Sequence, residues 1–250
     1  MKYLITLICL AIATIGWGQD QDNNFDKATT LYQKGDYTQA AAVYSSILKS
    51  GKESSALYYN LGNTYYKLNN VPESIYYYEK ALQLDPENAD AKNNLIFANQ
   101  MKVDAITPLP KTWVRQLSDG IVGLFSAHTW AVLSIIGVFA FVLSFLLYYF
   151  VERTALKRTF FSLMLVFLFF AIGSYTLAHF CHKQVSQTQY AILFDKTVRV
   201  FSDANAYSSE VMQLHEGTKV EIIEDAKDWV KIRLVNGKTG WTKVSSLKKL

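Results

Sequence analysis

The chain has 250 residues, half of them hydrophobic, and a formal net charge of +4 at pH 7. The apolar residues concentrate in three runs, which excludes one ordinary soluble domain. Residues 19–110 carry 8 Lys/Arg and 11 Asp/Glu, whereas residues 182–250 carry 11 and 8. Neither part has the concentrated positive charge that nucleic-acid binding requires, so this class of protein is excluded as well.

The first apolar run lies at the amino terminus and has the organisation of a secretory signal peptide. Lys2 supplies a positive charge before an apolar core over residues 3–15, which is short for a membrane span. Gly18 is a small residue of the kind that signal peptidase accepts before the cleaved bond. We therefore expect removal of residues 1–18 and a mature start at Gln19, with an uncleaved anchor as the alternative.

Residues 19–104 contain a pattern that returns every 34 positions. Matching positions hold residues of similar size in the two copies, namely Ala28 and Gly62, Leu31 and Tyr65, Ala40 and Ser74, and Tyr44 and Tyr78. Small residues let two helices approach closely, and large ones fill the space between them, so each copy predicts a helical hairpin. A third, partial copy over residues 89–101 predicts a single helix that caps the stack.

This pattern resembles the tetratricopeptide repeat, whose period is 34 residues. The second copy matches the family signature at Tyr58, Leu61, Gly62, Tyr65, Ser74, Tyr78, Ala81 and Pro86. The first copy departs from the aromatic-Leu-Gly start, with Asn24, Lys27 and Ala28 in those places. The resemblance implies an all-α solenoid whose concave face binds a peptide or a segment of a protein.

The predicted concave face combines aromatic and amide side chains, which suit a peptide backbone and its side chains. The groove residues that we predict to contact a partner are Tyr32, Tyr59, Asn60, Asn63, Tyr66, Lys67, Asn94 and Phe97, and by register Phe25 and Thr29 belong to the same face. The alternative is that these tyrosines only pack or contact water.

Residues 105–128 are predicted to be a linker and an interfacial helix. Pro108 and Pro110 interrupt regular structure. Trp113, Leu117 and Ile121 then follow at helical spacing, as do Val114 and Leu124, which predicts a helix lying along the membrane surface. An irregular linker is the alternative.

Two long uncharged runs predict a membrane hairpin, because each can cross about 30 Å of hydrocarbon. We expect transmembrane helices over residues 129–151 and 159–180, joined by a cytoplasmic loop over residues 152–158. Buried core helices are the alternative, but these runs are apolar on all faces. Arg153, Lys157 and Arg158 in the connector VERTALKR favour the cytoplasm. With an export signal, this predicts both soluble domains on the periplasmic side of a bacterial inner membrane.

Residues 181–250 alternate between apolar and polar positions in short stretches, which predicts strands at TVRVFS, KVEIIED, DWVKIRL and TGWTKV. Glu216-Gly217 and Asn236-Gly237 predict turns. The order resembles a bacterial Src-homology-3 (SH3) domain, which implies a small all-β barrel that binds peptides or cell-wall fragments. Thr197 stands where the family usually has Asn. Trp229 and Trp241 are predicted first as core residues and also as candidate ligand contacts.

No motif predicts catalysis, a cofactor or a metal site. The sequence has no phosphate loop and no HExxH, GxSxG or CxxC pattern, and its four His are scattered. Cys181 is the single cysteine that remains after the predicted cleavage, so it has no partner within the mature chain for a disulfide. We therefore expect a protein that is not an enzyme and needs no cofactor.

The order of parts predicts a multi-domain membrane protein with a repeat solenoid, a two-helix transmembrane hairpin and an SH3-like barrel. This order resembles the BatE family of the Bacteroidetes aerotolerance operon. The resemblance implies an envelope complex with other Bat proteins, some of which carry von Willebrand factor A domains. Two hypotheses follow from the sequence: a scaffold that binds protein partners, or a subunit that senses cell-wall material through the barrel.

Overall fold

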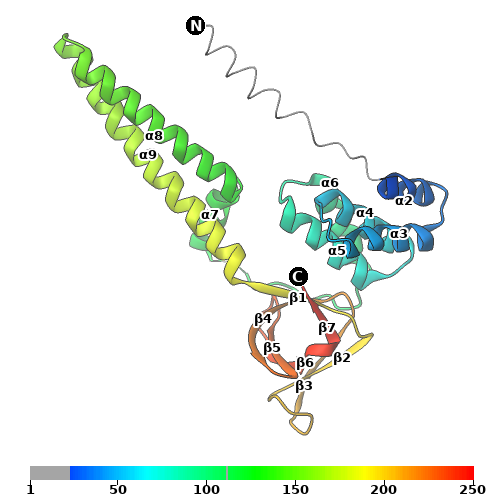
Figure 1. Cartoon of the computed structure of the whole chain (residues 1–250). Coiled ribbons are helices and arrows are strands. Elements are labelled where there is room, and N and C mark those ends of the chain that lie inside the picture. Colours follow the sequence, from blue (N-terminus) through cyan, green and yellow to red (C-terminus); the bar gives the residue numbers. More distant parts are fainter. Residues whose placement is uncertain (1–22, 111) are drawn as a thin grey trace.

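The computed structural model describes residues 23–110 and 112–250, so the expected signal peptide lies outside the described residues. It contains a helical domain, a pair of long helices and a β-barrel (Figure 1). The predicted fold class is therefore confirmed: a helical repeat region, two long apolar helices and an antiparallel all-β domain.

The helical domain is a stack of hairpins with a final single helix. Its elements are α2 (Asn23–Gln33), α3 (Tyr37–Lys49), α4 (Ser55–Lys67), α5 (Val71–Leu84) and α6 (Ala89–Gln100). Four of these helices have a side-chain cap that accepts a backbone N–H of the first turn, from Asp36, Ser54, Asn70 and Asn88 respectively. Such caps satisfy donors that the helix itself leaves unpaired, which explains where each helix begins.

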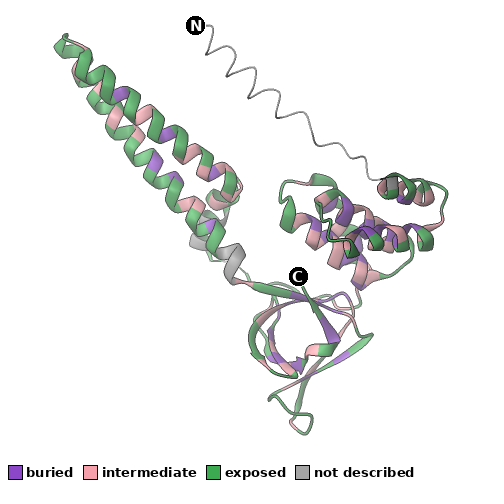
Figure 2. Ribbon diagram, in the orientation of Figure 1, coloured by how far each residue is buried: buried purple, intermediate pink, exposed green. Residues whose placement is uncertain are grey.

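The two long helices, α8 (Ala127–Phe150) and α9 (Thr154–Gln187), pack against each other and are preceded by α7 (Trp113–Val122). By length and composition both could cross a membrane, since each contains an 18-residue stretch of high mean hydropathy, 2.5 in α8 and 2.1 in α9. Few of their residues are buried, so most of their apolar surface lies on the outside (Figure 2). Close packing is possible at Gly137, whose position faces Ala171 and Phe170, and Ser134 Oγ donates to the Ala171 carbonyl at 3.1 Å.

Only three of the eight residues of the basic connector lie outside the two long helices. Of VERTALKR, Val151, Glu152 and Arg153 lie between the helices, and α9 begins at Thr154. Lys157 and Arg158 therefore belong to the first turns of α9, because Ala, Leu and Lys are strong helix formers. The other end of α9 continues to Gln187, and only Thr188 separates it from the start of the barrel at Gln189.

The barrel is one antiparallel sheet in the order β3-β2-β6-β5-β4-β1-β7. Its strands are β1 (Gln189–Leu193), β2 (Thr197–Phe201), β3 (Glu210–His215), β4 (Lys219–Ala226), β5 (Trp229–Arg233), β6 (Thr239–Lys243) and β7 (Leu247–Lys249). Inward residues alternate along the strands, as at Val198 and Val200 in β2. Gly217 and Gly237 both have φ of +81°, as the predicted turns require.

The barrel docks on the repeat domain. Ile192 of β1 is fully buried in one hydrophobic cluster with Ile75, Tyr78 and Ala98 of the repeat domain. Lys219 Nζ also donates to Glu79 Oε2 at 2.7 Å across the same boundary. Burial of an aliphatic side chain contributes about 1.5–3 kcal/mol. The two domains therefore form a joined unit with a shared core.

Residues 102–110, here called the strap, run from α6 along the barrel. Asp104 accepts three hydrogen bonds from the barrel: from the His215 backbone N–H at 2.7 Å, from Thr218 Oγ1 at 2.7 Å and from His215 Nδ1 at 2.8 Å. Ile106 packs against the barrel core, and the Leu109 N–H donates to the Val235 carbonyl. The predicted linker is thus bound to the barrel over its first part.

Burial of the Asp104 carboxylate opposes its charge, but the hydrogen bonds from His215 and Thr218 outweigh burial and lower the pKa of Asp104. A carboxyl whose pKa is lower in the folded state than its unfolded value of about 3.9 stabilises the fold above that value. The contribution is present at neutral pH and is lost as the pH falls through the folded pKa.

We predict that Asp104→Asn loosens the strap, because one amide oxygen cannot accept all three bonds. The expected cost is about 1–3 kcal/mol. Hydrogen exchange of strap amides in the full chain should be faster than in the parent protein, while Asp225→Asn, which breaks an exposed pair with Lys249, should change little. Unchanged strap protection in Asp104→Asn would show that these bonds do not hold the strap.

Candidate functional sites

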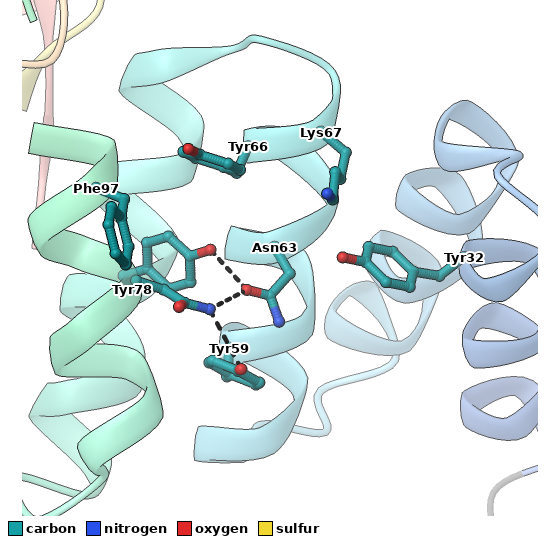
Figure 3. Close-up of a pocket in the computed structure, with 8 residues that line it drawn as sticks. Tyr32, Tyr59, Asn63, Tyr66, Lys67, Tyr78 and Phe97 are labelled. Atoms are coloured by element: carbon teal, nitrogen blue, oxygen red, sulfur yellow. Dashed lines mark hydrogen bonds between the residues drawn. The ribbon is translucent and has the colours of Figure 1, made fainter. Parts of the chain in front are cut away.

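The repeat domain has a cavity of about 290 Å³ on the face formed by α2, α4 and α6 (Figure 3). It is lined by Tyr32, Tyr59, Asn63, Tyr66, Lys67, Tyr78, Asn94 and Phe97. Helix α4 supplies four of these side chains, at positions 59, 63, 66 and 67, because residues three and four apart share one face of a helix.

A hydrogen-bond network orients the polar groups in this cavity. Asn63 Oδ1 accepts from the Tyr78 hydroxyl at 2.6 Å and from Asn94 Nδ2 at 2.8 Å, and Asn94 Nδ2 also approaches the Tyr59 hydroxyl at 3.3 Å. Burial, followed by the neighbouring Tyr59, raises the pKa of Tyr78, so its hydroxyl stays protonated and donates. The Asn63 NH₂ group points away from these partners (Figure 3).

The cavity offers hydrogen-bond donors together with tyrosine hydroxyls that can donate or accept and the Asn94 amide oxygen, which accepts. Lys67 contributes an ammonium group, Asn63 an NH₂ group, and Tyr32 and Tyr66 contribute hydroxyls. None of the described residues that line the cavity is Asp or Glu. Phe97 is 54% exposed and adds an apolar surface. The arrangement therefore suits a segment with carbonyl or carboxylate acceptors and an apolar side chain.

Seven of the eight predicted groove residues line this cavity, and Asn60 does not. Asn60 follows Tyr59 directly, and one residue turns a helix by about 100°, which places it on another side of α4. Phe25 and Thr29 lie outside the lining as well, and both contact Tyr44. Whether the lining residues bind a partner stays a prediction.

Tyr78 is the lining residue that sequence reasoning assigned only to the core. Its ring is 1% exposed and lies on Gly62, where an added Cβ would come within 2.5 Å of Tyr78 Cδ1. Because Gly62 has no side chain, the Tyr78 ring can lie directly against α4, and its hydroxyl then reaches Asn63. The 34-residue pattern contains both residues, but it does not reveal where the hydroxyl points.

The barrel has a second, separate pocket of about 240 Å³ near the β2–β3 loop. Trp229 and Phe201 meet edge to face there, with ring centroids 5.6 Å apart. Arg199 and Lys243 also line it, together with one acid, Asp195, and all three are exposed. The pocket thus combines an aromatic wall with a net positive formal charge.

The two predicted tryptophans have different positions. Trp229 lines the barrel pocket, whereas Trp241 lies outside its lining, with the Lys231 ammonium 5.7 Å from its ring centroid. Both are partly buried, as expected for residues that also support the fold. Among the described residues, no group of three His, Cys, Asp or Glu could hold a metal ion.

Comparisons with known proteins agree with the two soluble domains. Residues 25–89 match the model of the tetratricopeptide repeat, and residues 196–248 match the model of the bacterial SH3 domain. A search of curated proteins found no match for the chain. The chain therefore combines a helical repeat domain with a bacterial SH3 domain, and both types point to binding of proteins or cell-wall material.

We predict that Gly62→Ala destabilises the repeat domain by about 1–3 kcal/mol, because the new methyl group would overlap a ring that has no room to move. Thermal unfolding of the full chain in detergent, followed by hydrogen exchange of α4 and α5, measures this change. Gly120→Ala is the matched control, since no atom lies within 4 Å of a Cβ at that helical position. Equal stability of the two variants would contradict the packing of Tyr78 on Gly62.

Proposed function

We propose that this protein is a non-enzymatic scaffold of the bacterial inner membrane that holds a segment of a partner protein in its repeat groove. The observation that carries this proposal is the polar cavity, in which the Asn63 amide is oriented by Tyr78 and Asn94. Preorganised polar groups beside an exposed aromatic ring are features of a binding site.

The joined arrangement of the domains supports a scaffold. The barrel shares a core with the repeat domain through Ile192, and the strap ties the two together through Asp104. The groove and the barrel pocket are then held at a set separation, so one partner, or two, could engage both. Binding at one site would raise the effective concentration at the other.

The proposed location rests on sequence and composition. Two long apolar helices are suited to membrane anchoring. The basic connector between them favours the cytoplasm, and the amino-terminal signal pattern favours export of both soluble domains to the periplasm. The order of parts further suggests a place in a Bat-type aerotolerance complex, with von Willebrand factor A proteins as candidate partners.

We expect a photo-crosslinking amino acid at Tyr66, in living cells, to capture one or a few envelope proteins. The same probe at Gln83, which is exposed on α5, should capture none of them. Lys67→Glu should reduce capture about tenfold if the partner presents acceptors, because charged hydrogen bonds contribute about 1.5–3 kcal/mol. Equal capture from both positions would rule out the groove as the binding site.

A second candidate function is recognition of cell-wall material by the barrel pocket. Arg199 and Lys243 beside Trp229 favour an anionic peptide or glycan, and the pocket adjoins the β2–β3 loop, where Tyr207 is fully exposed.

If this function is correct, Arg199→Gln should weaken sedimentation of the full chain with purified peptidoglycan, and the remaining binding should be less sensitive to salt. Lys231→Gln, which removes a cation outside the pocket, should have no effect. Equal loss in both variants would indicate general attraction to the basic barrel, not a site.

A further inference from the structure

A third cavity, of about 760 Å³, lies between the strap and the barrel. Val220 and Leu234, both buried, form part of its lining, with Leu109 of the strap and Tyr190 of β1 beside them. It is separate from the repeat groove and from the barrel pocket, with which it shares no lining residue.

The chain segments that frame this cavity lead directly to the long helices. The strap ends at Pro110, and α7 begins at Trp113 and is followed by α8. On the other side, Tyr190 is the second residue of β1, which follows α9 after Thr188. Helix α7 and strand β1 accordingly lie at the same end of the α8–α9 hairpin (Figure 1). If the hairpin crosses a membrane, this cavity is close to the bilayer surface.

Exposed apolar side chains continue from the cavity toward that surface. Leu109 is 60% exposed and Val235 is 56% exposed. On α7, Trp113 is 76% exposed and Leu117 is 59% exposed. Exposure of these apolar side chains to water is unfavourable. Tryptophan is favoured at the boundary between lipid and water. The surface that leads into the cavity therefore suits lipid better than water.

The charges in the cavity favour an anion. Lys219 and Arg233 line it with one acid, Glu221, so the formal charge of the lining is positive. Lys219 is bound to Glu79 of the repeat domain at 2.7 Å. Arg233 meets Glu221 at 3.5 Å through one nitrogen, and its side chain is 46% exposed. A guanidinium has five N–H donors in a plane, so Arg233 can donate to a phosphate while it contacts Glu221.

We propose that this cavity binds an anionic phospholipid of the membrane in which the hairpin is anchored. The phosphate lies at Arg233, and the glycerol and first acyl carbons lie against Leu109 and Val235. This inference rests on the proposed membrane anchoring. The bound lipid ties the strap and barrel to the bilayer surface, and through them sets the height and direction of the repeat groove.

The test uses the full chain in nanodiscs of phosphatidylcholine that contain phosphatidylglycerol with a diazirine near its glycerol. After illumination, mass spectrometry locates the lipid adducts. We expect adducts on α8 and α9, and also on the strap and on the β5–β6 turn that contains Val235. A cation near an anionic surface contributes about 1 kcal/mol, so Arg233→Gln should lower the cavity adducts about fivefold.

Two further variants keep the test specific. Lys231→Gln, on the same strand but outside the cavity lining, should leave all adducts unchanged. Val235→Asp places a negative charge at a position that is 56% exposed, and it should also lower the cavity adducts. Adducts on the hairpin should be the same in every variant, which shows that the protein remains inserted.

The outcomes separate this inference from the proposed anchoring. Adducts on the hairpin but none on the strap would overturn the lipid site and leave the anchoring intact. Absence of adducts on the hairpin would overturn the anchoring, and the lipid site with it. Cavity adducts that form equally with a phosphatidylcholine probe and persist in Arg233→Gln would overturn the assignment of an anionic headgroup.

Discussion

The packing of Tyr78 on Gly62 is the contact on which the repeat core, the groove and the junction with the barrel all depend. The buried ring fills the space between α4 and α5, and its hydroxyl orients Asn63 in the groove. The same side chain belongs to the cluster that receives Ile192 from the barrel. One tyrosine therefore supports the repeat core, the polar network and the junction between the domains, so a change at this point reaches all three.

The barrel covers apolar surface of the repeat domain that its final helix α6 does not cover alone. Terminal surfaces of a short solenoid need such cover. Here Ile192 of β1 packs in the cluster with Ile75 of α5 and Ala98 of α6, and Phe194 meets the ring of Tyr76 edge to face. The strap adds directional bonds at Asp104. The SH3 domain thus acts as part of the cap of the repeat domain, in addition to any ligand that it binds.

The groove could be predicted to a large extent because helical repeats are governed by local spacing. Tyr59, Asn63 and Tyr66 share a face of α4 whatever the rest of the chain does, since a helix returns to the same side after three or four residues. Asn60 lies on another side of α4, because one residue turns a helix by about 100°. In the barrel, the sequence did not predict β1, β3 and β7. Strand β7 has only three residues, and burial along β1 and β3 does not alternate from one residue to the next, so the period-two pattern is missing.

By itself, the sequence determined the repeat period, the two apolar helices and the alternating strands, because each depends on residues that are close in the chain. Only the tertiary structure decided that the strap belongs to the barrel and that the barrel docks on α5. Asp104 meets Thr218 and Ile192 meets Ala98 across long separations in sequence, and each residue alone is compatible with an ordinary linker or strand. Such contacts depend on complementary shape and satisfied hydrogen bonds, which leave no periodic signal along the chain.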